Sequence, residues 1–246
     1  MRIRRWAPLS GEKVHKVLRY VELNLSELGP IVRAARALAR SASHDADIAH
    51  RYDHCDCVAK LCRRIGKEEA ADMELLISAA YLHDLVSRGK SGAVSHQLAS
   101  AKKAERFLRS KGMPVNRAKA VRAIIEESSY ESSLKRIRPS SIEAMVLRDA
   151  DFLEAMGARG IARAFAFIGW NKGKSLGELA WDPRRPPRLK MKKSGPDPSA
   201  IWHFSSKLLR LKDLMCTSAG KRMARSRHSY MVKFLLTYAL EMKAVS

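Results

Sequence analysis

The spacing of apolar side chains constrains this chain more than any other feature. Apolar residues recur three and four positions apart in VAKLCRRI, DMELLISAAYL, QLASAKKAERFL, RAKAVRAII and SIEAMVLRDADFLEAM. That period places them on one face of an α-helix. It returns near the C-terminus in WHFSSKLLRLKDLM and SYMVKFLLTYALEM, whereas alternating runs long enough for a sheet are missing. The pattern predicts an all-α bundle, with Asp72, Asn116 and the PSS before Ile142 as helix starts.

The charge balance indicates a class of partner. Lys and Arg number 47 against 25 Asp and Glu, which gives a formal net charge of +22. Such a field attracts nucleic acid, membrane surfaces, nucleotides and polyphosphates. No apolar run reaches the roughly 18 residues that span a bilayer, and the N-terminus lacks the apolar part of a signal peptide. We therefore expect a soluble cytoplasmic protein without a membrane partner, and its four cysteines should be reduced thiols.

Three polar side chains fall on apolar stripes. His54 extends the stripe of Val58 and Leu61 by one turn, and His83 continues the stripe of the next helix. Asp149 lies among Met145, Val146, Phe152, Leu153 and Met156. A buried carboxylate needs a partner, and imidazole with carboxylate is a common ligand set for divalent ions. The coincidence on three helices favours a metal site over three separate hydrogen-bonded core residues.

These residues resemble the H…HD…D signature of the HD-domain metal-dependent phosphohydrolases. The segments YDHCDCV, SHQLASAKKAERFL, DADFLEAMGARGIARAF and HFSSKLLRLKDLMCTSAGKRMARSRHSYMVKFL are similar to a soluble bacterial and archaeal subgroup, some of whose members hydrolyse nucleoside triphosphates. The similarity runs from about residue 28 to 242. It implies an N-terminal extension at 1–27, an HD core at 28–168 and C-terminal helices at 201–246 that pack on the same core. Between them, the segment 169–200 is rich in Pro, Gly and basic residues, which predicts a long loop.

The resemblance also implies the ligands of one divalent ion, which are His54, His83, Asp84 and Asp149. Manganese is the first choice, with iron, cobalt, nickel, magnesium or zinc as alternatives. In this assignment the first aspartate of DAD is the ligand. Asp151 either orients a ligand or forms a hydrogen bond within the helix bundle. The reaction would be hydrolysis of a phosphoester or phosphoanhydride of a nucleotide, or of another phosphorylated small molecule, by metal-activated water.

Cationic groups would stabilise charge on the phosphate oxygens. The candidates for binding substrate are Arg88, Lys90, His96, Arg159 and Arg163. His96 is also a candidate proton donor to the leaving oxygen, because it stands at a predicted helix start. Asp84 and His96 are therefore the candidate catalytic groups.

The chain departs from its relatives at two positions. Ser128 stands where many of them have a histidine, which makes two-metal chemistry doubtful, and His50 or Glu127 could substitute. Cys57 stands where relatives often carry arginine, for which Arg51 or Arg63 could serve. Two other functions stay open: an HD-fold nucleic-acid-binding protein or nuclease, and a catalytically idle metal-bound sensor. The bond cut, the role of the 169–200 loop and the oligomeric state do not follow from the sequence.

Overall fold

Helices form nearly all of the regular structure. The computed structural model describes residues 29–42, 52–86, 96–134, 136–170, 175–187 and 199–243. The helices are α2 (Pro30–Ala42), α3 (Tyr52–Glu68), α4 (Met73–Leu82), α5 (His96–Ser110), α6 (Val115–Glu127), α7 (Tyr130–Leu134), α8 (Ile142–Glu154), α9 (Gly157–Trp170), α10 (Ala200–Ser206), the 3₁₀ helix η4 (Leu208–Leu214) and α11 (Ser218–Lys243). Within those ranges there is no strand, only one isolated bridge between Ser175 and Ser199. The predicted all-α class is confirmed.

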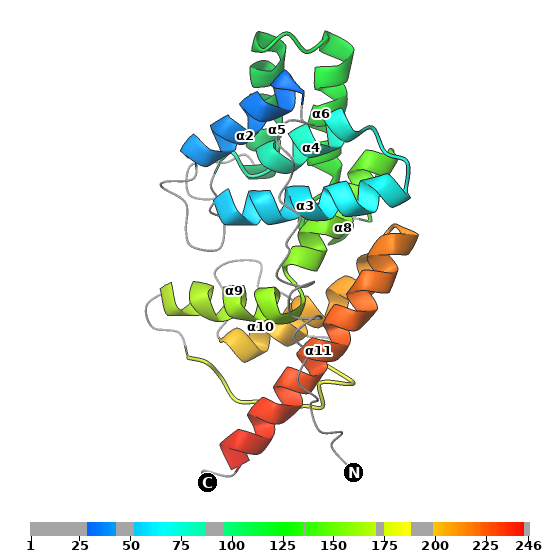
Figure 1. The fold of residues 1–246 in the computed structure, drawn as a ribbon. Coiled ribbons are helices and arrows are strands. Elements are labelled where there is room, and N and C mark those ends of the chain that lie inside the picture. Colours follow the sequence, from blue (N-terminus) through cyan, green and yellow to red (C-terminus); the bar gives the residue numbers. More distant parts are fainter. Residues whose placement is uncertain are drawn as a thin grey trace, which may run out of the picture.

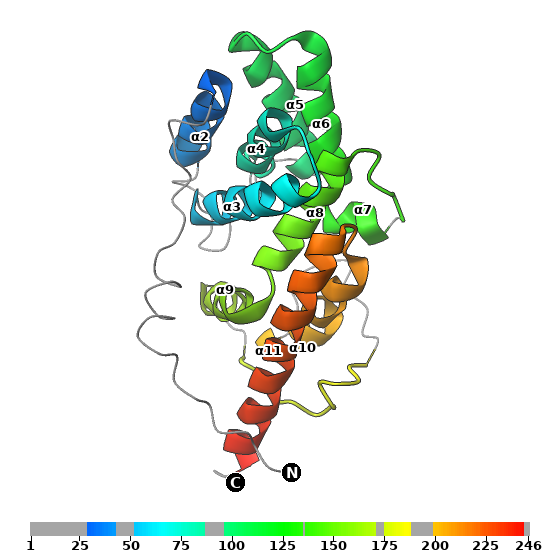
Figure 2. The same ribbon diagram turned by 45° about the vertical axis from the view of Figure 1, so that its right-hand side comes forward.

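Helix α8 lies between two groups of helices. It packs on α3, α4 and α6 on one side, and on α9, α11 and η4 on the other (Figures 1 and 2). Its buried residues consequently cover the whole circumference: Ala144, Val146, Leu147, Arg148, Asp149, Ala150, Phe152, Leu153 and Glu154. A helix buried all round shows no single apolar stripe.

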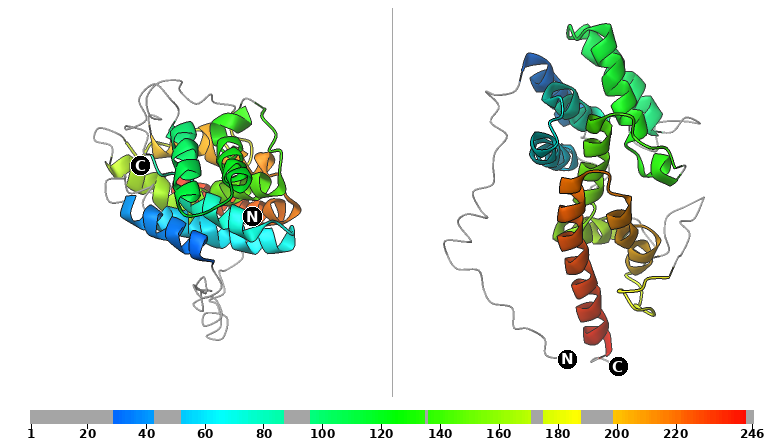
Figure 3. Two further views of the ribbon diagram at one scale, coloured as in Figure 1. Left: turned by 90° about the horizontal axis from the view of Figure 1, so that it is seen from above. Right: turned by 90° about the vertical axis from the view of Figure 1, so that its right-hand side faces the viewer.

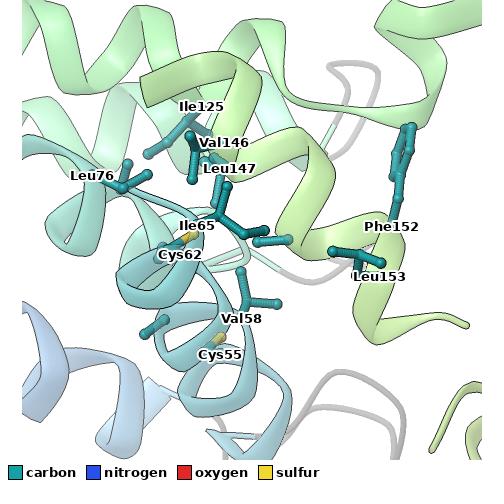
Figure 4. Close-up of a cluster of buried hydrophobic side chains, with 14 of the residues drawn as sticks. Cys55, Val58, Cys62, Ile65, Leu76, Ile125, Val146, Leu147, Phe152 and Leu153 are labelled. Carbon is teal, nitrogen blue, oxygen red and sulfur yellow. The ribbon is translucent and has the colours of Figure 1, made fainter. Parts of the chain in front are cut away.

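The apolar stripes expected from the sequence meet in one core around α3 and α8. Val58, Cys62 and Ile65 of α3 are fully buried beside side chains of the neighbouring helices (Figure 4). The neighbours labelled in that view include Leu76, Ile125, Val146 and Leu147. This core fixes the axes of α3, α4 and α8, and therefore the positions of the polar residues at their ends.

Two helix starts are as expected and one is not. The Asp72 carboxylate accepts hydrogen bonds from the backbone N–H groups of Glu74 and Leu75, and Ser141 accepts one from Ala144. Asn116, in contrast, lies inside the first turn of α6, which begins at Val115 after Pro114. Pro114 takes the boundary because its fixed φ suits a helix entry.

The 169–200 segment begins later than expected, since α9 continues to Trp170. Its described part, 175–187, packs on the C-terminal helices. Tyr238 of α11 donates to the carbonyl of Gly177 at 2.9 Å, and Ser205 of α10 donates to that of Pro187 at 2.9 Å. The basic run at 188–198 lies outside the described residues.

Helix α11 contributes to the core as far as Leu235 and extends beyond it with its last turns. Ala219, Ala224, Met231 and Leu235 are buried, whereas Leu240 and Met242 near its end are exposed. Figure 3 shows α11 alongside α8 and continuing past it. No helix of the described segments is long and apolar enough to cross a bilayer.

All four cysteines are free thiols. Cys55 and Cys62 are buried in α3, while Cys57 and Cys216 are partly exposed. Burial raises the pKa of the Cys55 thiol, so this side chain stays protonated and packs as a small apolar residue. The expectation of reduced cysteines agrees with this arrangement.

Candidate metal centre

Two adjacent ends of helices bring the first three predicted ligands together. His54 lies in the first turn of α3, and His83 is the C-terminal cap of α4, with Asp84 next to it. The His83 Nδ1 atom is 2.8 Å from the carbonyl oxygen of Ala80, one of the carbonyls that the end of α4 leaves without a helical partner. This bond turns the His83 ring so that Nε2 faces α3.

The donor atoms of these residues converge. His54 Nε2 lies 3.2 Å from His83 Nε2 and 3.6 Å from Asp84 Oδ2, and His83 Nε2 lies 3.7 Å from the same oxygen. One ligand atom from each residue lies within 4.8 Å of the others. Donors bound to one ion at about 2.1 Å would be about 3.0–3.5 Å apart, so the observed spacing fits a single ion with little adjustment.

The hydrogen bonds at Nδ1 decide what the two Nε2 atoms can do. His54 Nδ1 is 3.0 Å from Glu154 Oε2, and His83 Nδ1 faces the Ala80 carbonyl, so both Nδ1 atoms face groups that only accept. Each Nδ1 therefore carries a proton, and in the neutral form of the rings the lone pair of each Nε2 is directed toward the other. Burial, reinforced by the nearby Arg163 charge, lowers the pKa of His54 well below its usual value. Two facing lone pairs beside carboxylate oxygens are an arrangement that a cation stabilises.

Asp151 joins this group. Its Oδ1 atom lies 3.4 Å from His54 Nε2 and 4.0 Å from His83 Nε2. Three helices thus contribute four side chains, and Asp84 and Asp151 are more exposed than the two imidazoles, with 16% and 32% of their side-chain surfaces accessible. Access from solvent is therefore on the carboxylate side.

Asp149 does not join the group, which corrects the expectation that it is the fourth ligand. Its Oδ1 accepts a hydrogen bond from Cys216 N–H at 2.7 Å, and its Oδ2 accepts from Thr217 N–H and from Thr217 Oγ1, each at 2.7 Å. Residues 149 and 151 are about 200° apart around a helix, so their side chains leave α8 on different sides. Asp149 points to the start of α11, and Asp151 points to α3 and α4.

Asp149 is instead an anchor for α11. It is fully buried, and Thr217, which precedes the helix, also accepts a hydrogen bond from Gly220 N–H at 2.9 Å. A carboxylate at this end is favoured by the helix dipole. Burial raises the pKa of Asp149, and its hydrogen bonds from Cys216 and Thr217 oppose that shift. A Cβ atom on Gly220 would lie 2.2 Å from Asp149 Oδ2, so only glycine allows this approach.

Glu154 is a site residue that the sequence reasoning missed. It is fully buried, three positions after Asp151, and its carboxylate contacts His54 Nδ1, Arg159 Nε at 2.7 Å, and Arg163. The available signal was an acidic residue at the end of an apolar helix, on the side of Asp151. Arg159 and Arg163, two of the three arginines predicted to bind substrate, therefore form ion pairs with Glu154.

The other predicted residues are distributed unevenly. Arg88 and Lys90, together with His50 and Arg51, lie outside the described residues. His96 is the first residue of α5 and is half-buried. Val86 N–H donates to Ser100 Oγ at 3.0 Å, which ties the start of α5 to the turn that follows Asp84.

Of the two groups proposed to substitute for the missing histidine, His50 lies outside the described residues and Glu127 is engaged by Ser140. The Ser128 hydroxyl is buried and donates to the Ile125 carbonyl. Cys57 is partly exposed on α3.

Comparison with known proteins places these residues in a recognised family. Residues 51–156 match the model of the HD domain. The chain is 34% identical over 201 residues to the uncharacterized protein YpgQ of Bacillus subtilis, an alignment that covers 81% of this chain and 88% of the relative.

Solved structures of similar proteins extend the match to the fold. A Lactobacillus plantarum protein superposes with a TM-score of 0.69 at 30% identity, covering 87% of this chain and 97% of its own. YpgQ in complex with ADP gives 0.64 at 30% identity, with 86% and 94% covered. An HD-superfamily hydrolase from Bacillus thuringiensis gives 0.63 at 30% identity, with 87% and 97% covered.

Proposed function

Because this chain belongs to the HD-domain family, we propose that it is a metal-dependent phosphohydrolase whose substrate is a nucleotide. The observation that carries the proposal is the pair of facing Nε2 atoms, 3.2 Å apart, with Asp84 and Asp151 beside them. We propose His54, His83, Asp84 and Asp151 as the ligands of one divalent ion. Manganese is our first choice of metal, from the mixed nitrogen and oxygen donor set.

The proposed reaction uses the accessible side of this group. When bound, a divalent ion supplies Lewis acidity toward a phosphoryl oxygen and a water molecule. Asp84 and Asp151, the more exposed ligands, face the side from which a phosphate group approaches, and the buried imidazoles hold the opposite side. His96 starts α5 next to the turn that carries Asp84, so we propose it as a phosphate contact or as the proton donor to the leaving oxygen.

The nucleotide is proposed from two lines of support. The similar protein YpgQ has been crystallised with ADP. The net charge of +22 favours a polyanionic substrate. Arg88 and Lys90 stay in the proposal as cations for the phosphate oxygens, whereas Arg159 and Arg163 leave it because both contact Glu154.

The test combines metal content with turnover. The purified protein is analysed for metals, then screened for phosphate and pyrophosphate release from nucleoside mono-, di- and triphosphates with Mn²⁺, Mg²⁺, Co²⁺, Ni²⁺ or Zn²⁺ added. We expect about one ion per chain and cleavage of at least one nucleotide. His96→Gln should reduce turnover and leave the metal bound. A metal-loaded protein that cleaves no nucleotide would refute the proposed substrate.

Nucleic-acid binding is a second candidate, and one surface favours it. The outward face of α5 carries four exposed cations within about 120° of the helix circumference, and no acidic residue of α5 lies on that face: Lys102, Lys103, Arg106 and Arg109. Glu105 turns inward and pairs with Arg122 at 3.2 Å. The face is suited to contacts with a phosphate backbone and has no aromatic side chain for stacking on bases.

Salt dependence separates this candidate from general charge. Replacement of all four α5 cations by glutamine should flatten the dependence of RNA or DNA affinity on salt, because fewer counterions are released. The matched control replaces four exposed cations elsewhere: Arg64, Lys67, Lys221 and Arg225. Equal losses in the two variants would mean that binding follows net charge and that α5 is no dedicated surface.

A further inference from the structure

Glu154 is a buried carboxylate beneath the proposed metal site. None of its surface is accessible, and a carboxylate removed from water is costly unless charged or hydrogen-bonded partners surround it. Its partners come from two helices. His54 of α3 offers Nδ1 at 3.0 Å, while Arg159 and Arg163 of α9 both contact the carboxylate oxygens.

Helix α9 holds His54 at a second point as well. Arg159 Nη2 donates to the backbone carbonyl of Asp53, the residue before His54, at 3.1 Å. One arginine therefore binds both the carboxylate that orients the imidazole and the backbone next to it. The side chain of His54 and its main chain are both tied to α9.

The turn between α8 and α9 makes this possible. Gly157 has a φ of +73°, which an L side chain rarely adopts, and a Cβ atom on Gly160 would lie 2.2 Å from the Ala155 carbonyl oxygen. The sharp reversal returns α9 toward α3 within a few residues. Arg159 and Arg163, one turn apart on α9, then lie on the same side of the helix and reach one carboxylate.

We propose that Glu154 is a positioning residue for metal binding, and that Arg159 and Arg163 clamp its carboxylate so that His54 presents Nε2 to the ion. The clamp lies beyond residues 51–156, the region matched by the HD-domain model, so part of what sets metal affinity comes from α9. This inference rests on the proposed metal site. It assigns Arg159 and Arg163 to orientation of a ligand.

The physical basis is the coupling between a ligand and the groups behind it. A carboxylate hydrogen-bonded to Nδ1 fixes the tautomer and the ring orientation of a metal-binding histidine, and it increases the basicity of Nε2. A purely structural ion pair would instead stabilise the contact between α8 and α9 and leave the affinity for metal unchanged. The two roles differ in measurable ways.

The experiment measures Mn²⁺ affinity by titration calorimetry on the metal-stripped full chain and on three variants: Glu154→Gln, Arg163→Gln and the double variant. We expect Glu154→Gln to weaken Mn²⁺ binding by about 10-fold to 100-fold. Arg163→Gln should weaken it less, because Arg159 still holds the carboxylate. The double variant should be no worse than Glu154→Gln, since both changes act through the same imidazole. Arg163→Lys should recover part of the affinity.

Arg122→Gln is the matched control. Arg122 makes a comparable two-carboxylate ion pair with Glu105 and Glu126, between α5 and α6, outside the proposed site. Its loss should leave Mn²⁺ affinity unchanged. Thermal unfolding of each stripped protein separates loss of binding from loss of fold, and Arg163→Gln carries the test if Glu154→Gln fails to fold.

A spectroscopic readout tests the orientation directly. In the stripped wild-type protein, the nitrogen-15 spectrum of the histidine rings should show His54 with its proton on Nδ1, and Glu154→Gln should reduce the population of that tautomer. Unchanged Mn²⁺ affinity and an unchanged tautomer, with lowered thermal stability, would overturn the positioning role. Failure of the wild-type chain to bind Mn²⁺ or any other divalent ion would instead overturn the metal site itself.

Discussion

The two sides of α8 carry acidic residues with opposite surroundings. On the α11 side, Asp149 has both oxygens filled by hydrogen bonds from Cys216 and Thr217. On the α3 side, Asp151 lies beside the Nε2 atoms of two imidazoles whose Nδ1 atoms face hydrogen-bond acceptors. Both acids belong to the DAD triplet, yet within the described residues only the first has hydrogen-bond donors on both of its carboxylate oxygens. Asp149 is also fully buried whereas Asp151 is partly exposed, but the chemical type of the neighbouring atoms is what identifies the first as an anchor and the second as a proposed ligand.

The largest expected effect is on stability, when the hydrogen bonds that Asp149 accepts next to α11 are disrupted. Asp149→Asn replaces two acceptor oxygens by one and leaves buried donors of Cys216 or Thr217 unpaired, so the free energy of unfolding should fall by about 3 kcal/mol. Chemical denaturation of the metal-stripped protein measures this. Mn²⁺ affinity of the folded variant should equal that of the wild type. Loss of binding with intact stability would return Asp149 to the ligand set.

The next largest effect is on metal affinity, when Asp151 on the α3 side of α8 is replaced. Asp151→Asn removes a negatively charged oxygen that would bind the ion, so Mn²⁺ affinity should fall by at least about 100-fold. A direct metal ligand contributes at least as much to affinity as the residues that hydrogen-bond to the ligands. The stripped protein should be as stable as the wild type, since one of several neighbouring negative charges is gone. Elemental analysis after dialysis and a denaturation curve give the two values. Full metal content in this variant would exclude Asp151 as a ligand.

A smaller effect tests how closely α11 approaches the anchor. Gly220→Ala places a methyl group 2.2 Å from Asp149 Oδ2, and the required shift should cost about 1–3 kcal/mol of unfolding free energy. Gly169→Ala is the control, because nothing lies within 4 Å of its added methyl group. The control should be neutral or slightly stabilising, as alanine favours a helix. Equal stability of the two variants would contradict the close approach.

The smallest expected effect is on the pH dependence of stability, and it arises on the α11 side of α8. Half-burial, with the nearby Lys212 charge, lowers the pKa of His228 on α11 below 6.5. The unfolded chain therefore takes up this proton first, so the stabilising contribution is complete above pH 6.5 and is lost as the pH falls below it. Between pH 7.5 and 5.5, the stripped wild-type protein should lose a few tenths of a kcal/mol more than His228→Gln, after allowance for solvent screening. Parallel pH curves would refute this contribution.

The residues that sequence reasoning placed well are those whose helices have one buried face. His54 and His83 follow stripes of α3 and α4, and both stripes lead to the same point. The all-α class followed from the same period. Asp84 was placed by resemblance, and the structure brings it to within 3.6 Å of His54.

The misplaced residues belong to α8 and α9. A stripe shows that Asp149 is buried but not which neighbour it meets, and α8 has neighbours on every side. The partners of Asp149 come from positions 216 and 217, and those of Glu154 come from α3 and α9. Such pairings depend on how distant segments pack, which periodicity does not encode. The charge on Arg159 and Arg163 suggested phosphate for the same reason: their carboxylate partner was not visible.

The four cysteines differ in exposure, so the rates at which their thiols react report local opening of the folded chain. Cys57 on α3 and Cys216 before α11 are partly exposed, one near each side of α8, whereas Cys55 and Cys62 are enclosed. A thiol-specific reagent should label the first pair in the folded protein and reach the second pair only when α3 opens. Loading with Mn²⁺ should slow the labelling of Cys55, next to His54, more than that of Cys216. The rates at the separate thiols then give a map of local opening, without an added probe.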